Sequence, residues 1–532
     1  MDEEVPLVIV GGSLVGLSAS VLLGHHGVPH VLLERHQGTA IHPRAASFHQ
    51  RTLEIYRSVG LQEAIEEAAE REFVQNGAII AVDSLAGREL AAFYHSFNQG
   101  VEHLSPTRRL FITQIGLEPV LRKHAAASGA DLRYATEVTD LQQDESGVTV
   151  STRARDTGEE RRIRARYVIG ADGAHSQTRR TLGIPMQGRG EFARCVTIYF
   201  KADVRAFLRG RNLSVVYVNQ PRLLAFFRFS ITGDAGFLAV FSTLDEHGRR
   251  VDLFHEDLPD ERCADLVRTA LGAAKDFPVA VENVQLWTAS AQTAAAFRQN
   301  NIFLAGDAAH VMPPTGGFGG NTGVADVHNL AWKLAMVLDG RADPALLDSY
   351  DAERRPIAHV TVEQAFLRYV ERVDPSLPAE NLPETLADTA IELGAVYHSS
   401  AVIEPEHRSC LSEPPEQASG RPGTRLAHYW IRNGDECIST IDLVGRELML
   451  LTGPAGGDWS RAATRMGRIE TCQLTDEIAL VGLGLSGGAA LIVRPDGIIG
   501  WRCDEAGPNP KAKLEAAMQK LLGSPATSDA VA

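Results

Sequence analysis

The strongest constraint on the fold is a strand, a glycine turn, a helix and a second strand at the start of the chain. Residues 5–10 (VPLVIV) form a continuous run of apolar β-formers, which is typical of a strand buried on both faces of a parallel sheet. Apolar residues then repeat at helical spacing from Leu14 to Leu22, and a second apolar run, HVLLE, ends at Glu34. Two parallel strands joined by a helix define a βαβ unit, so the sequence predicts an α/β fold with a Rossmann-like domain.

The turn in this unit differs by one residue from the G-x-G-x-x-G motif that binds dinucleotides, because Ser13 stands where the second glycine is expected. Gly11 suits the tight turn, and Gly16 lets the helix pack closely against the strand. Ser13 is small, its hydroxyl is a donor for a phosphate oxygen, and helix N-terminal amides supply further phosphate contacts. Glu34 lies about 20 residues further on, where an acidic residue binds a ribose hydroxyl. We predict a dinucleotide site, with NAD or FAD favoured over NADP, at Gly11, Ser13, Leu14, Gly16, Glu34 and Arg35.

Composition argues against several other classes of protein. The chain has 532 residues and a net charge of −15, whereas a nucleic-acid-binding surface would be basic. The six cysteines form no C-x-x-C pair, so we expect no zinc ribbon, dithiol redox site or other metal site. The opening residues, MDEE, do not resemble a signal peptide, and no apolar run has the roughly 18 residues that a membrane span requires. We predict a cytoplasmic protein without a nucleic-acid or membrane partner.

Two later segments repeat the pattern of a strand followed by a glycine turn. Residues 167–184 place a short strand before an Asp-Gly pair. Residues 301–335 place a buried strand before a Gly-Asp pair, followed by a loop rich in proline and glycine and by an amphipathic helix that we expect to begin near Asn321. Glycines in such a loop let backbone amides lie close to a planar ring, and a helix N-terminus stabilises negative charge on it. Because the loop has buried flanks, a flexible linker is disfavoured.

Together the three segments resemble the single-component FAD monooxygenases that hydroxylate aromatic rings and share the p-hydroxybenzoate hydroxylase fold. The resemblance extends over residues 5–365 and implies that the first glycine turn binds the ADP part of FAD. It also implies that the Asp-Gly pair contributes to FAD and NAD(P)H binding, that the Gly-Asp pair holds the ribose and ribityl groups, and that the proline loop lies against the isoalloxazine ring. The further FAD-binding residues that it implies are Arg44, Gln114, Asp172, Gly306, Asp307, Pro314, Gly317, Gly319, Gly320 and Asn321.

The FAD site departs from the family pattern in two places. The first is Ser13 in the glycine turn. The second is the flavin loop, which reads GGFGGNTG where many members of the family have GGQGMNTG, so that Phe318 and Gly320 are unusual. We expect Phe318 to add an apolar wall near the ring and Gly320 to add conformational freedom.

Residues 185–290 alternate between apolar stretches and turns, which indicates an antiparallel sheet with one covered face. The resemblance implies that this sheet is the substrate domain, inserted into an FAD-binding domain made of residues 1–184 and 291–370. The candidate pocket residues, each of which also fits a place in the sheet core, are Tyr217, Phe226, Arg228, Phe241 and Pro313.

A stretch rich in proline and acidic residues after residue 370 predicts a linker or helical segment over residues 371–410. The segments that follow, such as STIDLVGRELMLLTG and LIVRPDGIIGWR, are similar to the C-terminal thioredoxin-like domain of phenol hydroxylase and of the polyketide hydroxylases. We therefore expect a thioredoxin-like domain over residues 411–532, without a C-x-x-C pair and without thiol redox chemistry. Members of this family often have this domain near a dimer interface, which makes a homodimer one expectation.

The resemblance implies a reaction in which NAD(P)H reduces FAD, O₂ adds to the flavin as a C4a-hydroperoxide, and one oxygen atom passes to an electron-rich ring. Because the flavin carries the chemistry, no catalytic side chain is assigned. The flavin loop, YHSSAVIE at 397–404 and the C-terminal domain are most similar to the aromatic polyketide hydroxylases of antibiotic biosynthesis, so a polycyclic phenol is the expected substrate. Simple phenols, a Baeyer–Villiger outcome, a non-hydroxylating FAD-binding relative and the choice between NADPH and NADH stay open. An FAD halogenase is disfavoured because its W-x-W-x-x-I-P stretch is not found.

Overall fold

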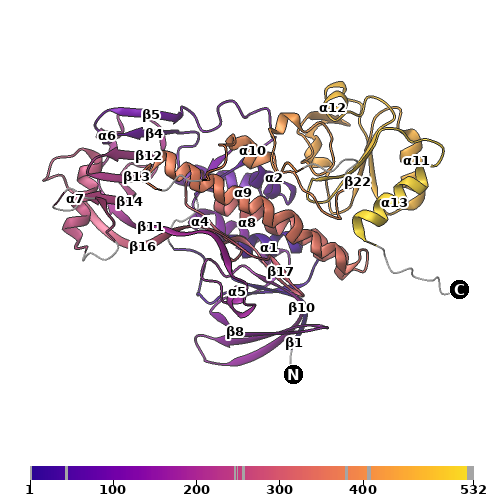
Figure 1. The fold of residues 1–532 in the computed structure, drawn as a ribbon, viewed down its shortest axis with the longest axis horizontal. Coiled ribbons are helices and arrows are strands. Elements are labelled where there is room, and N and C mark those ends of the chain that lie inside the picture. Colours follow the sequence, from indigo (N-terminus) through magenta and orange to yellow (C-terminus); the bar gives the residue numbers. More distant parts are fainter. Residues whose placement is uncertain are drawn as a thin grey trace.

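The computed structural model divides the chain into three parts, two of which are built on large sheets and one on a small C-terminal sheet (Figure 1). In Figure 1 the C-terminal part lies at the right, the first large sheet lies at the bottom and the second lies at the left. The structure describes residues 3–41, 46–244, 247, 250–253, 258–377, 381–403 and 409–523.

The first sheet has eight strands and contains the predicted βαβ unit. β1 (Glu3–Val10) pairs in parallel with β2 (His30–Leu33) on one side and with β10 (Glu160–Gly170) on the other. β10 pairs in parallel with β18 (Ile302–Leu304), so the strands that precede the three glycine segments are neighbours. Their carboxyl ends meet at one edge of the sheet, and the predicted α/β fold is confirmed. The remaining strands of this sheet are β7 (Asp131–Arg133), β8 (Thr136–Asp144), β9 (Gly147–Ala154) and β17 (Arg298–Gln299).

Helices cover one face of this sheet, and the hairpin of β8 and β9 covers the other. α8 (Phe318–Leu338) begins within one turn of Asn321, as expected, but it is buried along most of its length instead of being amphipathic. The reason is that α1, α2 and α9 all pack against it. Figure 1 shows α9 running lengthwise from the second sheet towards the first. The other helices of this region are α1 (Leu14–His25), α2 (Gln50–Ser58), α3 (Gln62–Glu72), α4 (Gln114–Ala127), α5 (Gln177–Thr181), α9 (Asp348–Arg372) and α10 (Asp388–Leu393).

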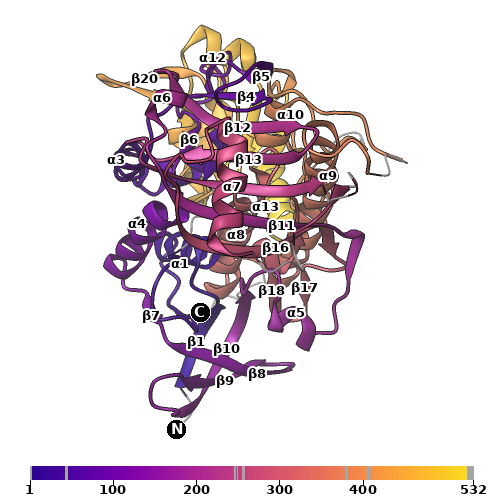
Figure 2. The same ribbon diagram turned by 90° about the vertical axis from the view of Figure 1, so that its left-hand side faces the viewer.

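The second sheet has nine strands in the order β19-β16-β11-β14-β13-β12-β4-β5, with β15 beside β14, and most neighbours are antiparallel. α7 (Asp260–Leu271) lies across one face, as Figure 2 shows, and buries an apolar core against it. Two of the strands come from before residue 185, so the sheet draws on more of the chain than residues 185–290. Its strands are β4 (Ala78–Val82), β5 (Glu89–Tyr94), β11 (Met186–Lys201), β12 (Leu213–Gln220), β13 (Leu223–Phe229), β14 (Ala235–Leu244), β15 (Arg250–Val251), β16 (Ala280–Ala294) and β19 (His310–Val311); α6 (Arg205–Leu208) follows β11.

The C-terminal part contains a four-stranded sheet in the order β23-β22-β24-β25. β22 pairs in parallel with β23 and antiparallel with β24, and helices α11 and α13 cover one face. Its elements are β20 (Trp430–Asn433), β21 (Glu436–Ser439), β22 (Met449–Thr452), α11 (Gly457–Met466), β23 (Glu470–Gln473), α12 (Glu477–Gly482), β24 (Ala490–Val493), β25 (Ile499–Cys503) and α13 (Pro510–Leu522). A short two-stranded antiparallel sheet of β3 (Ser47–Phe48) and β6 (Leu110–Phe111) belongs to the first part. Among the helices described, none combines the length and apolarity needed to span a lipid bilayer.

Candidate active site

The first glycine turn is crowded by backbone at two positions. Gly11 has a φ of +106°, its N–H donates to the Leu33 carbonyl at 2.8 Å, and a Cβ there would lie 2.3 Å from the Ala171 carbonyl oxygen. A Cβ on Gly16 would lie 1.8 Å from the Gly11 carbonyl oxygen. Side chains therefore cannot be accommodated where β1, α1 and the Asp-Gly segment meet. Leu14 begins α1 here, so the unpaired amides of the first helical turn lie at this edge of the sheet.

The Glu34 carboxylate lies at the end of β2, next to this turn. Its Oε2 accepts the Gly12 N–H at 2.7 Å, and its Oε1 accepts the His36 N–H at 2.8 Å. These two backbone contacts fix the side chain, which is 8% exposed, while each oxygen keeps a lone pair for another donor. Arg35 is exposed beside it and donates from Nε to His36 at 3.2 Å.

The structure brings Ser13 and Gln114 together through Glu118, a residue that the sequence reasoning missed. Glu118 is fully buried, and its Oε1 accepts the Ser13 hydroxyl at 2.5 Å and Gln114 Nε2 at 2.9 Å. Its Oε2 accepts the Ala40 N–H at 2.7 Å. The single proton of the Ser13 hydroxyl is thus directed to Glu118, and the expected contact of Ser13 with a phosphate oxygen stays a prediction. The i, i+4 spacing of Gln114 and Glu118 on one helix was the signal available in the sequence.

The other two glycine segments contact the first one directly. A Cβ on Gly11 would lie 3.1 Å from Asp172 Cα, and one on Gly306 would lie 2.7 Å from Val15 Cγ2. The Asp172 carboxylate accepts the Ser176 hydroxyl at 2.5 Å and the Thr178 N–H at 2.9 Å, so it holds the start of α5. The three predicted segments therefore form one continuous surface at the carboxyl ends of β1, β10 and β18.

Asp326 of α8 orders the Gly-Asp pair and was not predicted. Its Oδ2 accepts the Gly306 N–H at 3.0 Å and is 2.7 Å from His310 Nε2, and its Oδ1 accepts Arg354 Nε at 2.9 Å. All three side chains are buried. Burial alone would raise the pKa of Asp326, but His310 and Arg354 hold it below the ordinary value. The neighbouring Asp307 side chain is exposed at this edge.

The proline and glycine loop is fastened by Asn321. Its Nδ2 donates to the Ser47 carbonyl at 2.9 Å and to the Gly317 carbonyl at 2.7 Å. Its Oδ1 accepts the His49 N–H at 2.9 Å and the Thr52 hydroxyl at 2.6 Å, so the amide is fully engaged within the protein. What the segment still offers to a ligand is the backbone N–H groups of the first turn of α8, which contains Gly319 and Gly320. In the same loop Pro313 is buried and Pro314 is exposed.

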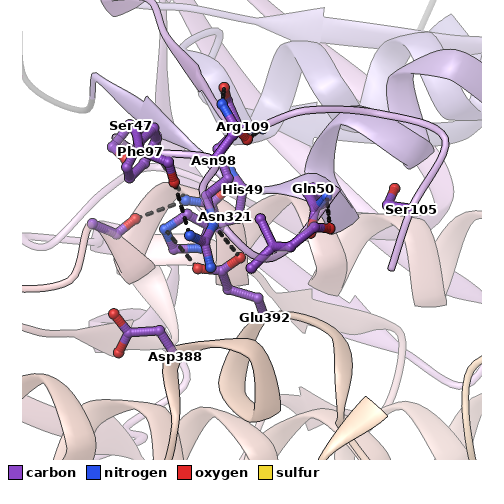
Figure 3. Close-up of polar contacts among 12 residues, drawn as sticks. Ser47, His49, Gln50, Phe97, Asn98, Ser105, Arg109, Asn321, Asp388 and Glu392 are labelled. Atoms are coloured by element: carbon purple, nitrogen blue, oxygen red, sulfur yellow. Dashed lines mark hydrogen bonds and ion pairs between the residues drawn. The ribbon is translucent and has the colours of Figure 1, made fainter. Parts of the chain in front are cut away.

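A buried polar network lies beside this loop, and Figure 3 shows its members pointing towards one another from elements distant in the chain. His49 Nε2 lies 3.0 Å from the Gly316 carbonyl oxygen and 3.9 Å from Glu392 Oε1. Glu392 of α10 also accepts Arg109 Nε at 2.9 Å, and both of these side chains are almost completely buried. Burial lowers the pKa of His49; Glu392 opposes this change, and Arg109 adds to it. The sequence gave no signal for this network, because its residues come from three separate segments. Arg44 lies outside the described residues.

The face of the second sheet that α7 does not cover carries the other predicted pocket residues. Tyr217, Phe226 and Phe241 form one aromatic cluster, in which the Phe226 and Phe241 rings stack with centroids 5.7 Å apart. α9 closes part of this face, since Tyr369 meets the Phe241 ring edge-on at 5.4 Å. Arg228 lies on the same face of β13 and is 7% exposed, with its guanidinium over the Phe73 and Phe111 rings.

The residues at the first sheet edge fit FAD. The glycine turn leaves space that a Cβ would fill, the first turn of α1 offers amides to a pyrophosphate, and Glu34 offers fixed acceptors to ribose hydroxyls. A second helix N-terminus, that of α8, follows the loop at the other end of this surface. The same edge of the sheet thus offers groups for the nucleotide part of FAD at one end and groups for the flavin ring at the other.

Comparison with known proteins identifies the class. Residues 4–365 match the family model described as FAD binding domain, and residues 419–525 match the one described as aromatic-ring hydroxylase, C-terminal. The chain is 46% identical to a 4-methyl-5-nitrocatechol 5-monooxygenase of Burkholderia sp, with 98% of each chain covered. It is 38% identical to tetracenomycin A2 monooxygenase-dioxygenase of Streptomyces glaucescens, with 98% of this chain and 97% of that one covered.

Among solved structures, the chain is similar to aklavinone-11 hydroxylase in a ternary complex with FAD and aklavinone, with a TM-score of 0.91 and 32% identity. The match covers 98% of this chain and 99% of that one. The chain therefore belongs to the FAD-dependent aromatic-ring hydroxylases, as the three glycine segments predicted. Its cofactor is FAD, which the residues at this edge of the sheet would hold; when bound, FAD would supply the redox chemistry with NAD(P)H as co-substrate, while the protein would orient the aromatic ring and exclude water.

Proposed function

We propose that this enzyme hydroxylates a polycyclic, polyketide-type phenol, using NAD(P)H and O₂. The observation that supports it most is the full-length similarity to the aklavinone-11 hydroxylase complex, whose substrate is a polycyclic aromatic compound. The aromatic face of the second sheet agrees with such a substrate, because it carries packed aromatic rings together with the guanidinium groups of Arg228 and Arg372.

A single-ring phenol is the second candidate substrate. It is favoured by the 46% identity to the nitrocatechol monooxygenase, a higher identity than the 38% shared with the tetracenomycin enzyme. The two candidates differ in size and in the acidity of their hydroxyl groups, so a substrate panel separates them.

The roles of individual residues follow from their positions. We propose that the first turn of α1 binds the pyrophosphate, that Glu34 binds a ribose, that Asp307 binds ribose or ribityl hydroxyls, and that the first turn of α8 lies against the isoalloxazine ring. Ser13, Gln114 and Asn321 then act by holding these groups in place through the contacts described above.

The division into domains is proposed on the same basis. Residues 1–184 and 291–370 form the FAD-binding domain, residues 185–290 supply most of the substrate sheet, residues 371–410 connect, and residues 411–532 form the thioredoxin-like domain. Some elements contact parts outside their own range. β4 and β5 precede residue 185 but belong to the substrate sheet, and α10 of the connecting segment contributes Glu392 to the polar network beside the loop. A homodimer in solution stays a prediction.

The purified wild-type protein tests the function. We expect an oxidised flavin spectrum, and oxidation of NADPH or NADH that a polycyclic phenol such as a hydroxylated naphthacenequinone stimulates more than a nitrocatechol does. Mass spectrometry should find a product heavier by one oxygen atom, and NMR should show an intact ring, since a Baeyer–Villiger product carries the oxygen inside the ring. FAD binding without stimulation by any phenol would instead indicate a non-hydroxylating protein. Stimulation by the nitrocatechol alone would establish the single-ring candidate.

A further inference from the structure

Arg228 differs from the other buried arginines of the protein. The guanidinium carbon lies 4.6 Å from the centroid of the Phe73 ring and 4.8 Å from that of the Phe111 ring, and the residue is 7% exposed. Within the described part of the chain, its Nε and Nη2 are buried and have no hydrogen-bond partner. Glu72 is a carboxylate that raises the pKa of Arg228, and its oxygens already accept the Thr113 N–H at 2.6 Å and the Thr113 hydroxyl at 2.9 Å.

Most other buried arginines have carboxylate partners, and buried Arg179 donates to the backbone carbonyls of Ala308 and Ala174. Arg109 pairs with Glu392 at 2.9 Å, Arg354 with Asp326 at 2.9 Å, and Arg494 with Glu353 at 2.6 Å. Burial lowers the pKa of Arg228 to about 10, with Glu72 opposing the change, so the side chain is still a cation at neutral pH. An uncompensated buried charge is costly, and cation–π contacts offset only part of that cost. The Arg228 guanidinium is therefore suited to bind an anion that balances its charge.

The surroundings of Arg228 indicate which anion fits. Arg228 shares a sheet face with Tyr217, Phe226 and Phe241, so a planar ring can lie beside the guanidinium. Phe111 of β6 pairs with Ser47 of β3 in the short two-stranded sheet, and the Ser47 carbonyl accepts Asn321 Nδ2 at the end of the flavin loop. Arg228 thus lies between the aromatic face and the segment that fastens the loop.

We propose that Arg228 binds an ionised oxygen of the aromatic substrate, and that the substrate class is acidic phenols, which are phenolates near neutral pH. This inference rests on the proposed function of the same site. The guanidinium donates charge-assisted hydrogen bonds from Nε and Nη2 to the phenolate oxygen, while the Phe73 and Phe111 rings fix the orientation of the guanidinium plane. Nitro-substituted phenols belong to this class, and polycyclic hydroxyquinones belong to it only where the hydroxyl is conjugated with a quinone carbonyl and not hydrogen-bonded to it. An anionic reduced flavin is the other source of a negative oxygen, and the experiment separates the two.

The test compares two probes of similar size on the oxidised holoenzyme. 4-Nitrocatechol is ionised at mildly alkaline pH, and 4-methylcatechol is neutral there. Binding is measured from the change in flavin absorbance, which does not require turnover. The variants are Arg228→Met and Arg228→Lys, and the matched control is Arg222→Met, an exposed arginine at the turn before β13. FAD content and thermal melting show whether each variant is folded.

We expect the wild type to bind 4-nitrocatechol at least about tenfold more tightly than 4-methylcatechol. Arg228→Met should weaken 4-nitrocatechol binding by about ten- to a hundredfold and leave 4-methylcatechol unchanged, with FAD retained and a melting temperature no lower than that of the wild type. Arg228→Lys should recover part of the preference, and Arg222→Met should behave as wild type.

Equal or undetectable binding of both probes by the wild type would overturn the proposal, as would a preference that survives in Arg228→Met. A flavin reduction potential that falls in Arg228→Met while both affinities stay the same would assign the guanidinium to the flavin and would also overturn it. Failure of the proposed function is a separate result, because it would appear as a wild type that binds 4-nitrocatechol preferentially but oxygenates no phenol.

Discussion

The two ends of the proposed FAD site are built in different ways. At the nucleotide end, backbone conformation decides the structure, because Gly11 and Gly16 lie where any Cβ would meet a carbonyl oxygen. At the flavin end, side chains decide it, because Asn321 and Asp326 fasten the loop and the Gly-Asp pair through hydrogen bonds to segments distant in the chain.

This difference predicts different responses to mutation. A side chain added at the nucleotide end clashes with backbone that cannot move, so binding is lost in one step. A side chain shortened at the flavin end leaves polar groups unpaired, so stability and cofactor affinity fall by graded amounts. The Ser13 position is an intermediate case, since its side chain replaces a glycine of the motif yet is bonded to Glu118 and Gln114.

The largest effect is expected for Gly11→Val. The new Cβ would meet the Ala171 carbonyl oxygen at a φ that valine does not tolerate, so the turn and FAD binding should be lost. Absorbance of the purified protein and titration with FAD measure this. Gly38→Val, at a half-buried position with open space around its Cβ, should bind FAD normally. A yellow Gly11→Val protein, which still contains flavin, would show that FAD binding does not depend on the backbone conformation of this turn.

Asp326→Asn should cost about 3–5 kcal/mol of unfolding free energy, because it leaves Arg354 buried without its carboxylate partner. Since the folded-state pKa of Asp326 is lowered, its contribution is present at neutral pH and is lost as the pH falls below about 4. Denaturant titrations of wild type and variant should therefore converge at acid pH. Asp339→Asn, an exposed aspartate after α8, is the control, and equal stability of Asp326→Asn and wild type at neutral pH would refute the prediction.

Asn321→Ala should lower the free energy of unfolding by a smaller amount, about 1–3 kcal/mol in total, because its hydrogen bonds to the Ser47 and Gly317 carbonyls are only partly buried. We expect weaker FAD binding with the fold retained, because the loop and the Ser47 to His49 segment lose their common partner. The dissociation constant for FAD and the melting temperature measure the two effects separately. Asn433→Ala, on an exposed position of β20, should change neither. Unaltered FAD affinity in Asn321→Ala would show that the loop does not depend on this amide.

The smallest effect is expected for Ser13→Gly, which restores the motif. Glu118 keeps its contacts with Gln114 and the Ala40 N–H, so FAD affinity should stay within about twofold of the wild type. Fluorescence titration with FAD after removal of the bound cofactor measures this ratio. A tenfold or larger loss would mean that Ser13 itself contacts the cofactor.

The same contrast explains what could be predicted from sequence. The strands before Gly11, Asp172 and Gly306 could be predicted because apolar runs and glycine turns are local patterns. The resemblance of these segments to known flavin enzymes then indicated the family. The sequence did not predict the roles of Glu118 and Asp326, or the network of His49, Glu392 and Arg109, because the partners of these residues are brought together only by folding. The expected amphipathicity of α8 was wrong for the same reason, since its burial on several sides comes from α1, α2 and α9. The residue-level FAD contacts stay predictions.

The most direct test of the account is the fate of molecular oxygen. The FAD-loaded wild type, incubated with NADPH or NADH, ¹⁸O₂ and a hydroxylated naphthacenequinone, should form a product that carries one ¹⁸O atom on an intact ring, and removal of FAD should abolish it. Oxidation of the nicotinamide with all of the ¹⁸O₂ recovered as hydrogen peroxide, for this phenol and for 4-nitrocatechol alike, would contradict the assignment as a hydroxylase.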